Sequence, residues 1–298
     1  MDYVLKTQNL SKRYGSKYAL NELSMSVKKG EIYGFIGRNG AGKTTLMRLV
    51  LGVAQPTSGE IELFGGENLV SARRRIGSLL ETPSLYKDCT AYENLKRFSI
   101  LSGNSTKELR DILRLVGLSN TKGKPVSKFS LGMKQRLGIA VALLGHPDFL
   151  ILDEPINGLD PAGIKDVRDV ILRLNREKGI TFLISSHLLD ELSKIVDTYG
   201  IINDGVLIEQ VSAAEIESRC QHRLIIRCSN NAKAVQLIKG KYPDVGNIGS
   251  EGDALVLYSH INDSAVINKT LVENGVFVGE IYIQSRGLED YFIERIGG

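Results

Sequence analysis

The sequence of 298 residues contains no long apolar run. No stretch approaches the roughly 18 consecutive apolar residues that a membrane-spanning helix needs. The N-terminal segment MDYVLKTQNLSKRYG also lacks the apolar core of a secretory signal peptide. These two absences predict a chain that does not itself cross a bilayer and that works in the cytoplasm.

Cysteine is scarce, and charge of either sign is not concentrated. Cys89, Cys220 and Cys228 are too few and too irregularly spaced for a disulfide framework or a zinc site, so we expect buried, reduced thiols. The net charge is only +4, and the basic residues are dispersed apart from the run at 73–75. No nucleic-acid partner is expected, because such partners require a concentrated basic surface.

The length of the chain favours one large domain and one smaller one. Within residues 1–215, apolar runs alternate with helical patterns, which is typical of an α/β domain with a mostly parallel sheet. Residues 1–30 and 59–66 instead resemble short antiparallel strands, and a hairpin should turn at residues 203–205. Residues 220–298 follow the order βαββαβ, which predicts a small α+β, ferredoxin-like domain.

A helical insertion is predicted at about residues 88–147. Thr90 and Glu93 match the capping box T-x-x-E and should begin a helix over residues 91–101. A second helical repeat of apolar residues ends at Gly117. After the insertion, helices are expected over residues 161–178 and 188–196.

The segment GRNGAGKTT, residues 37–45, lies between an apolar run and a helical stretch. It matches G-x-x-x-x-G-K-[ST] through Gly37, Gly42, Lys43 and Thr44. Glycine lets backbone N–H groups converge on phosphate oxygens, and the following helix directs its positive end at the same anion. The motif predicts that Lys43 reaches the β and γ phosphates and that Thr44 offers a hydroxyl to Mg²⁺. An ordinary glycine-rich turn is the alternative interpretation.

A pair of carboxylates follows the apolar run at residues 149–152. Asp153 and Glu154 then lie at the C-terminal end of a strand, where α/β sheets bind their ligands. This position predicts that Asp153 belongs to the Mg²⁺ shell and that Glu154 orients the attacking water. The alternative is an acidic pair that closes a strand at the surface.

Together these motifs resemble the ATP-binding subunit of an ABC transporter over roughly residues 3–215. The segment FSLGMKQR at residues 129–136 stands where this family has its LSGGQ signature; it keeps Ser130 and Gly132 but departs from the family at Leu131 and Met133. The segment NGLD at residues 157–160 resembles the D-loop. The resemblance implies a P-loop NTPase core, with an antiparallel β subdomain and a helical insertion.

The resemblance also implies a role for each matching residue. Glu154, His187 and Lys43 would be catalytic, Ser130 and Gly132 would contact ATP held by a partner subunit, and Asp160 would lie at the dimer interface. Considered alone, Ser130 could simply cap a helix, and His187 could be an ordinary satisfied polar residue. Tyr14 would stack on the adenine base. The alternative is that it is an ordinary, half-buried tyrosine of a strand. The implied ATP-binding residues are Tyr14, Gly37, Arg38, Asn39, Gly40, Ala41, Gly42, Lys43, Thr44 and Thr45.

One residue departs from the family at the implied metal site. The implied metal ligands are Thr44, Asp153 and Glu81, and Glu81 stands where the family usually has glutamine. A carboxylate there can still accept from metal-bound water, but it adds a negative charge. The segments ETPSLY, SLGMKQR and LEDYF further resemble the subgroup associated with bacitracin resistance and self-protection against lantibiotic peptides.

The function implied is that of an ATP-hydrolysing subunit of an exporter for antimicrobial peptides or other hydrophobic compounds. ATP and Mg²⁺ are the implied cofactors. The implied partners are a second copy, through two shared ATP sites, and a separate transmembrane permease that docks near residues 81–86 at the inner face of the membrane. The C-terminal domain would stabilise the dimer or regulate it; the alternative is that it senses a small molecule. Two alternatives stay open: a soluble ABC-type ATPase acting in translation or DNA maintenance, and a nucleotide-binding regulator with little turnover.

Overall fold

The computed structural model describes residues 3–80, 83–121, 123–220, 222–246, 248–284 and 288–297. It divides into two compact units, one comprising Met1–Ala213 with Glu294–Gly298 and the other Ala214–Ile293. The predicted fold class is confirmed, because an α/β unit is followed by a smaller α+β unit. No helix in the described part of the chain is both long enough and apolar enough to span a membrane.

A six-stranded sheet forms the centre of the first unit, in the order β5-β6-β7-β3-β8-β9. Its first four pairings are parallel, and only β8 and β9 pair antiparallel. Every residue of the three middle strands β6, β7 and β3 is buried, which is why their sequences are apolar at successive positions. The strands are β3 (Ile32–Ile36), β5 (Ile76–Leu79), β6 (Phe149–Asp153), β7 (Thr181–Ser186), β8 (Thr198–Asn203) and β9 (Val206–Ser212).

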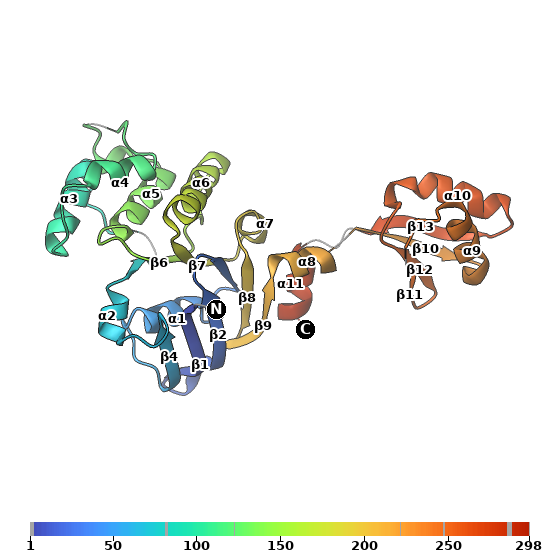
Figure 1. The fold of residues 1–298 in the computed structure, drawn as a ribbon, viewed down its shortest axis with the longest axis horizontal. Coiled ribbons are helices and arrows are strands. Elements are labelled where there is room, and N and C mark those ends of the chain that lie inside the picture. Colours follow the sequence, from blue (N-terminus) through green and yellow to red (C-terminus); the bar gives the residue numbers. More distant parts are fainter. Residues whose placement is uncertain are drawn as a thin grey trace. The chain divides into compact units, whose positions relative to one another are not determined.

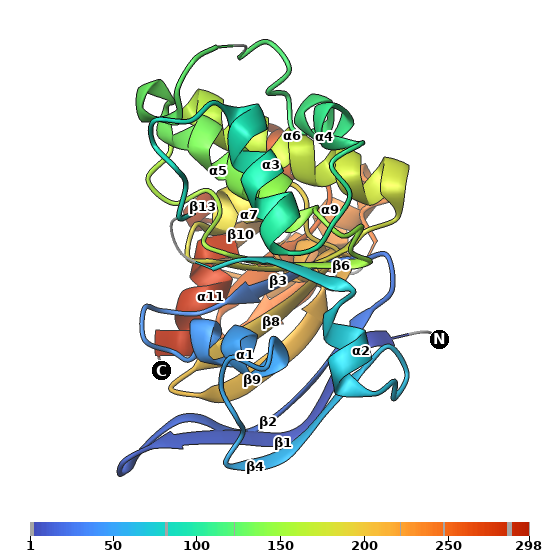
Figure 2. The same ribbon diagram turned by 90° about the vertical axis from the view of Figure 1, so that its left-hand side faces the viewer.

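Helices cover this sheet unequally. Figures 1 and 2 show α3, α4, α5 and α6 gathered on one side, with α1 and a second sheet on the other. The helices are α1 (Lys43–Val50), α2 (Leu69–Arg73), α3 (Ala91–Leu101), α4 (Leu109–Leu115), α5 (Leu131–Ala142), α6 (Pro161–Lys178) and α7 (Leu189–Leu192). The functional loop described below lies between β3 and α1.

The second sheet is antiparallel, in the order β2-β1-β4, as the sequence predicts. The strands are β1 (Tyr3–Tyr14), β2 (Lys17–Lys28) and β4 (Ser58–Leu63). The prediction of short strands was wrong for β1 and β2, which have 12 residues each. Their pairing contains several register shifts, and such bulges let a long two-stranded ribbon bend and twist. Buried side chains of both strands, such as Leu20, share a core with side chains of α1, such as Leu46.

The helical insertion begins with the predicted capping box. The Glu93 N–H donates to Thr90 Oγ1 (3.3 Å), and the Thr90 N–H donates to Glu93 Oε2 (2.8 Å). A later loop of the insertion runs beside this helix start, because the Val126 N–H donates to the Cys89 carbonyl at 2.9 Å. A 3₁₀ turn at Val126–Lys128 then leads into α5.

The helix predicted over residues 188–196 is much shorter, since α7 covers only Leu189–Leu192. Asp197 explains the early end. Its N–H donates to the Ile32 carbonyl (2.9 Å), and its Oδ2 accepts from the Ile32 N–H (2.8 Å). These bonds tie the chain to the start of β3 and force it out of the helix. The hairpin predicted at residues 203–205 is confirmed, with positive φ at Asp204 and Gly205.

The second unit contains the predicted βαββαβ order. The elements that follow β9 are α8 (Ala213–Arg219), β10 (Arg223–Cys228), α9 (Asn231–Lys241), β11 (Gly249–Glu251), β12 (Ala254–Leu257), a 3₁₀ turn (Ile261–Asp263), α10 (Ser264–Glu273), β13 (Val278–Gln284) and α11 (Leu288–Gly297). Ala213 at the start of α8 and the end of α11 from Glu294 belong to the first unit. The sheet order is β11-β12-β10-β13, with every neighbouring pair antiparallel. Residues of α9 and α10, including Ile238 and Leu271, pack with Leu224 of β10 in one core.

The cysteines differ in part from expectation. All three are free thiols, but each is only partly buried. Cys89 precedes α3, Cys220 follows α8, and Cys228 ends β10, so each lies at the margin of an element rather than in a core.

Candidate functional site

The loop between β3 and α1 is shaped by glycines that no other residue could replace without strain. A Cβ on Gly37 would lie 2.4 Å from the Ile202 carbonyl oxygen, and one on Gly42 would lie 2.4 Å from the Ala19 carbonyl oxygen. Gly42 also has φ of +112°, which side chains rarely allow. Gly42, the N-cap residue of α1, has no side chain that could cap the helix, and the first turn of α1 has no acidic side chain. The positive end of this helix is therefore available to an anion.

Lys43 is held inside this loop. Its side chain is only 6% exposed, and its Nζ donates to the Gly37 carbonyl at 2.7 Å and lies 3.4 Å from the Arg38 carbonyl oxygen. Its Nζ also lies 3.3 Å from Glu154 Oε1. A buried ammonium needs such partners, because desolvation disfavours an unpaired charge. The ammonium thus lies where the loop, α1 and β6 meet.

Asp153, the last residue of β6, joins two elements of the site. Its Oδ2 accepts a hydrogen bond from Thr44 Oγ1 at 2.6 Å, and its Oδ1 accepts one from the hydroxyl of Ser185 in β7. The carboxylate is 5% exposed. A hydroxyl and a carboxylate side by side provide the hard oxygen ligands that Mg²⁺ prefers.

Glu154 has an uncommon backbone conformation for a residue other than glycine, with φ of +50°. Its N–H donates to Ser185 Oγ (2.9 Å) and lies 3.2 Å from the Ser185 carbonyl oxygen, which fixes this conformation. Its Oε2 is 2.8 Å from Nδ1 of His187. Glu154 Oε1 is one of the few buried side-chain oxygens in the described residues that makes no hydrogen bond, although the Lys43 ammonium is near. An oxygen of this kind can accept from a bound molecule.

These side chains surround a cavity of about 190 Å³. Its lining includes loop residues, the start of α1, both carboxylates and Ala19 of β2. The structure therefore brings together these sequence-predicted residues: Asn39, Gly40, Gly42, Lys43, Thr44, Thr45, Asp153 and Glu154. His187 joins them through Glu154, whereas Arg38 is exposed on the same loop and Ala41 is buried beneath it.

Other predicted residues lie elsewhere. Tyr14, at the end of β1, is 52% exposed, with Lys12 Nζ 5.0 Å from its ring centroid. Neither Tyr14 nor the residues of the signature segment are among the described residues that line the cavity. The predicted metal ligand Glu81 lies outside the described residues.

The signature segment and the D-loop form a second cluster, built on α5 and α6. Ser130 caps α5 and accepts from the Met133 N–H (3.2 Å), while Asp160 caps α6 and accepts from the Gly163 N–H (3.1 Å). A Cβ on Gly132 would lie 3.2 Å from the Gly163 Cα, so the two helix starts approach closely. In both ribbon views α5 and α1 lie on opposite sides of the central sheet.

Sequence reasoning missed Ser185. Its buried hydroxyl donates to the Asp153 carboxylate and accepts from the Glu154 backbone N–H, so it fixes both residues. The available signal was the pair of serines at the end of the otherwise apolar strand TFLISS, next to β6 in the sheet. Ala19, which lines the cavity, gave no signal in the sequence.

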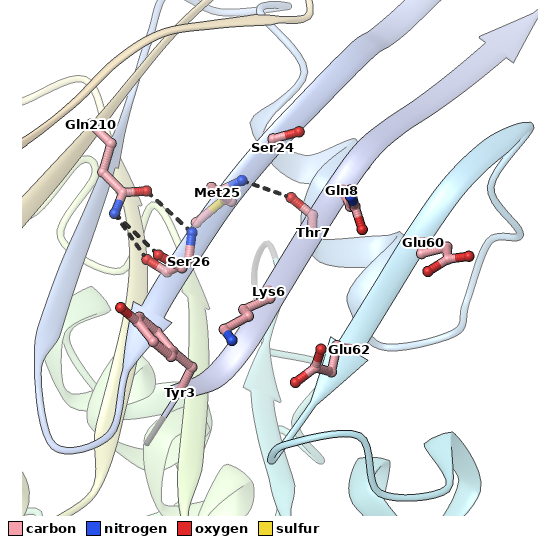
Figure 3. Close-up of a pocket in the computed structure, with 10 residues that line it drawn as sticks. All are labelled: Tyr3, Lys6, Thr7, Gln8, Ser24, Met25, Ser26, Glu60, Glu62 and Gln210. Carbon is pink, nitrogen blue, oxygen red and sulfur yellow. Dashed lines mark hydrogen bonds between the residues drawn. The ribbon is translucent and has the colours of Figure 1, made fainter. Parts of the chain in front are cut away.

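A larger hollow, of about 460 Å³, lies on the antiparallel sheet (Figure 3). Two of its polar side chains bond to backbone groups of β2: Thr7 Oγ1 accepts from the Met25 N–H (3.0 Å), and Gln210 Oε1 accepts from the Ser26 N–H (3.2 Å). Gln210 Oε1 also accepts from the Tyr33 hydroxyl (3.2 Å), and burial raises the pKa of Tyr33 well above its ordinary value, so this donor stays protonated. None of the described residues around this hollow is a predicted site residue.

Comparison with known proteins places this geometry in a family. The ABC transporter family pattern matches residues 20–157. The chain is 45% identical over 303 residues to the bacitracin transport ATP-binding protein BcrA of Bacillus licheniformis, covering 100% of this chain and 99% of the relative. It is 46% identical over 205 residues to the lantibiotic transport ATP-binding protein SrtF of Streptococcus pyogenes, covering 69% of this chain and 89% of the relative. The chain belongs to the ABC transporter family.

Solved structures agree with this assignment. A nucleotide-free ATP-binding cassette from an ABC transporter is 28% identical, with a TM-score of 0.67, and the match covers 72% of this chain and 94% of the cassette. The CbiO1 subunit from Clostridium perfringens, part of an ABC transporter complex, is 27% identical with a TM-score of 0.67, covering 83% of this chain and 98% of that subunit. This ABC protein is therefore an ATP-binding subunit whose activity is ATP hydrolysis.

Proposed function

We propose that this ABC ATPase powers the export of antimicrobial peptides or other hydrophobic compounds through a separate permease. The observation that carries the proposal is the meeting of Lys43, Thr44, Asp153, Glu154 and His187 at one edge of the central sheet. The names of the relatives, which concern bacitracin and lantibiotic transport, support the class of cargo. They do not favour a soluble ATPase of translation or DNA maintenance.

In the proposed site, the glycine-rich loop and the N-terminus of α1 hold the triphosphate. Backbone N–H groups in residues 39–45 would donate to phosphate oxygens, and the Lys43 ammonium would contact the β and γ phosphates. The ammonium already lies in the cavity, 3.3 Å from Glu154 Oε1. Tyr14 would stack on the adenine; its exposed ring leaves a face free for a base.

The side chains of Thr44 and Asp153 fit a Mg²⁺ ion. They contact each other at 2.6 Å, and sites for this ion usually combine one or two carboxylates with substrate phosphates. When bound, the ion would neutralise charge that develops on the β and γ phosphates. Glu81 stays a sequence-based prediction as a further ligand.

Glu154 would orient the attacking water and accept its proton. As the water oxygen bonds to the γ phosphorus, the bond from that phosphorus to the ADP oxygen breaks. Ser185 bonds to the backbone N–H of Glu154, and His187 contacts the carboxylate of Glu154 at Oε2. Oε1 is left without a hydrogen bond of its own, so it is the oxygen that can accept from water.

We further propose that two copies share two ATP sites, because Ser130 and Gly132 do not line the cavity of their own chain. A second copy arranged head to tail would bring its signature helix to the γ phosphate, and Asp160 would lie at this interface. Hydrolysis would then remove the contact that favours the closed dimer.

A sedimentation experiment tests the shared site. The Glu154→Gln protein should form a dimer with Mg-ATP and revert to monomer when Ser130→Arg is added, because a bulky cation blocks the helix start. Glu177→Gln, at an exposed position of α6, serves as the matched control for the first change. A stable dimer in the Ser130→Arg variant would contradict the arrangement.

The permease would dock at Leu85 and Tyr86, which places this subunit on the inner face of the membrane. Tyr86 is 41% exposed, yet its backbone is anchored, because its N–H donates to Asn94 Oδ1 at 2.8 Å. A ring with a fixed backbone is a suitable apolar anchor for a partner. Leu85→Cys should crosslink to the permease in membranes; no capture under any nucleotide condition would exclude this docking site.

A further inference from the structure

The sheet of the second unit has two edges of different character. Strand β11, at one edge, has only three residues, so it offers little backbone for pairing with another strand. Strand β13, at the other edge, has seven residues, and five of them are exposed. Among the strands in the described part of the chain, β13 pairs only with β10. Its outer side therefore presents a row of backbone N–H and C=O groups to which a further strand could bond.

The sequence of β13 lacks the features that usually keep an edge strand single. Soluble proteins protect long edges with lysine, proline or strong bulges. Strand β13 reads VGEIYIQ and contains neither lysine nor proline. Its one charged residue, Glu280, already has an ion pair with Arg227, at 3.4 Å between Oε2 and Nη1. The one register shift against β10 lies between Val278 and Glu280, so residues 280–284 form a regular edge.

Two large side chains of this regular edge are exposed on opposite faces of the sheet. Tyr282 and Ile283 are each 43% exposed, and successive residues of a strand point to opposite faces. Tyr282 lies opposite Ile225 of β10. Ile283 lies opposite Leu224, which belongs to the core shared with α9 and α10. A strand added at this edge would cover both side chains and would extend that core.

Strand β13 is complementary to itself in one antiparallel register. When Tyr282 lies opposite Tyr282 of a second copy, Ile281 lies opposite Ile283, and Glu280 lies opposite Gln284. Each cross-strand pair then joins side chains of like character, which is the arrangement that stabilises antiparallel strands. A register centred on Ile281 instead places the Glu280 carboxylate opposite the Tyr282 ring and loses these matches.

The polar pair of this register has the correct hydrogen-bonding groups. Gln284 Oε1 accepts from Arg223 Nε at 3.0 Å, which orients the amide nitrogen of Gln284 as a donor. A carboxylate accepts hydrogen bonds, so Glu280 of a second copy suits this donor. The two-fold pairing makes this contact twice, once at each end.

We propose that β13 pairs antiparallel with β13 of a second copy, in the register centred on Tyr282. This contact has two-fold symmetry, as a closed dimer requires. The self-complementary register favours a second copy over an unrelated segment as the occupant of the edge. Five residues from each copy form a small contact, so it would not hold two copies together at low concentration on its own. It strengthens a dimer that ATP has formed, because the second contact is then intramolecular. The strand pairing rests on the proposed function only in this respect.

Sedimentation of the full-length Glu154→Gln protein with Mg-ATP tests the contribution to the dimer. Adding Ile283→Lys should raise the dissociation constant about fivefold or more, because a lysine on each edge opposes strand pairing. Val266→Lys, at a position of α10 that is also 43% exposed, is the matched control and should change the constant less than about twofold. Equal constants for the two lysine variants would overturn the strand pairing. A Glu154→Gln protein that stays monomeric would instead overturn the shared ATP site, and crosslinking without nucleotide then decides on β13.

Cysteine crosslinking tests the register, at high protein concentration and without nucleotide. The three native cysteines are first replaced by serine. Tyr282→Cys should then form a disulfide between copies, because directly opposite residues of an antiparallel pair have Cα atoms about 4.5–5.5 Å apart. Glu280→Cys should not, because the two introduced thiols would lie four residues apart along the pair. No crosslink from Tyr282→Cys, or a faster one from Ile281→Cys, would overturn the register. This measurement also decides the outcome if Ile283→Lys does not fold.

Hydrogen exchange shows whether a second copy or another segment covers the edge. Peptides from residues 278–284 should exchange faster in the nucleotide-free monomer than in the Mg-ATP dimer of Glu154→Gln, because pairing protects the outward N–H groups. Equal protection in the monomer would show that the same chain covers β13, and it would overturn the proposal.

Discussion

The central six-stranded sheet of the first unit and the sheet of the second unit differ in the direction of their strands. In the first unit, β3, β6 and β7 run parallel, so their C-terminal ends meet at one edge, where Asp153 ends β6 and Gly37 and His187 follow β3 and β7. In the second unit all neighbouring strands are antiparallel, and successive strand ends alternate between opposite edges. A parallel sheet therefore brings together residues that are far apart in sequence, and an antiparallel one separates them.

The titratable groups of the two units follow the same contrast. Glu154 in the first unit contacts Lys43 through Oε1 and His187 through Oε2, and it lines the cavity of about 190 Å³. In the second unit His260 lies between two carboxylates, with Nε2 3.1 Å from Asp244 and Nδ1 3.2 Å from Asp263. Both ring nitrogens of His260 are thus already paired. The first cluster lines a cavity, whereas the second connects residues of its own loops.

Removing the central cation should have the largest effect. We expect Lys43→Ala to lower ATP turnover by about 10³-fold or more, because charge-assisted contacts to the phosphates are lost in binding and in the transition state. Glu154 would also lose its buried counter-ion. Phosphate release and binding of a fluorescent ATP analogue measure the two losses, with Lys178→Ala as an exposed control. Near-normal turnover would mean that the cavity around Lys43 is not the catalytic site.

Changing the carboxylate alone should separate chemistry from binding. Glu154→Gln should keep ATP affinity within a few-fold but reduce turnover by about 10²–10³-fold, because the amide cannot accept a proton from water. Single-turnover kinetics with radiolabelled ATP distinguish the two steps. Full turnover by this variant would remove Glu154 from the proposed role.

The histidine should matter less than the carboxylate that it holds. His187→Ala removes one hydrogen bond to Glu154 Oε2, worth about 1.5 kcal/mol, and should lower turnover about tenfold. The loss should appear in kcat rather than in KM, and it should vanish in a Glu154→Gln background. An equal loss in both backgrounds would show that His187 acts independently of Glu154.

A pair of glycine changes compares the stability of the two units, and the change in the second unit should have the smallest effect of all. Gly37→Ala places a Cβ 2.4 Å from a carbonyl oxygen and should destabilise the first unit by about 1–3 kcal/mol. Gly240→Ala, in helix α9 with nothing within 4 Å of the added atom, should stabilise the second unit by about 0.5–1 kcal/mol. Hydrogen exchange measured separately for each unit reads both effects. The same sign for both variants would be inconsistent with the geometry of these two positions.

Much of the fold could be predicted from the sequence because its signals are local. The capping box at Thr90 and the apolar runs of β3 and β6 depend only on residues that are close in sequence. The structure confirms the helix and the strands that they predict. The early end of α7 could not be predicted, because it depends on bonds between Asp197 and Ile32, which are distant in sequence. Ser185 was missed for the same reason: its role depends on the register of β7 beside β6.

The most direct test of the shared ATP site is a structure of the Glu154→Gln protein with Mg-ATP. We predict two copies in head-to-tail arrangement, with each triphosphate in contact with Lys43 of one copy and Ser130 of the other. A triphosphate bound entirely by side chains and backbone groups of a single polypeptide, with Ser130 exposed to solvent, would contradict this prediction.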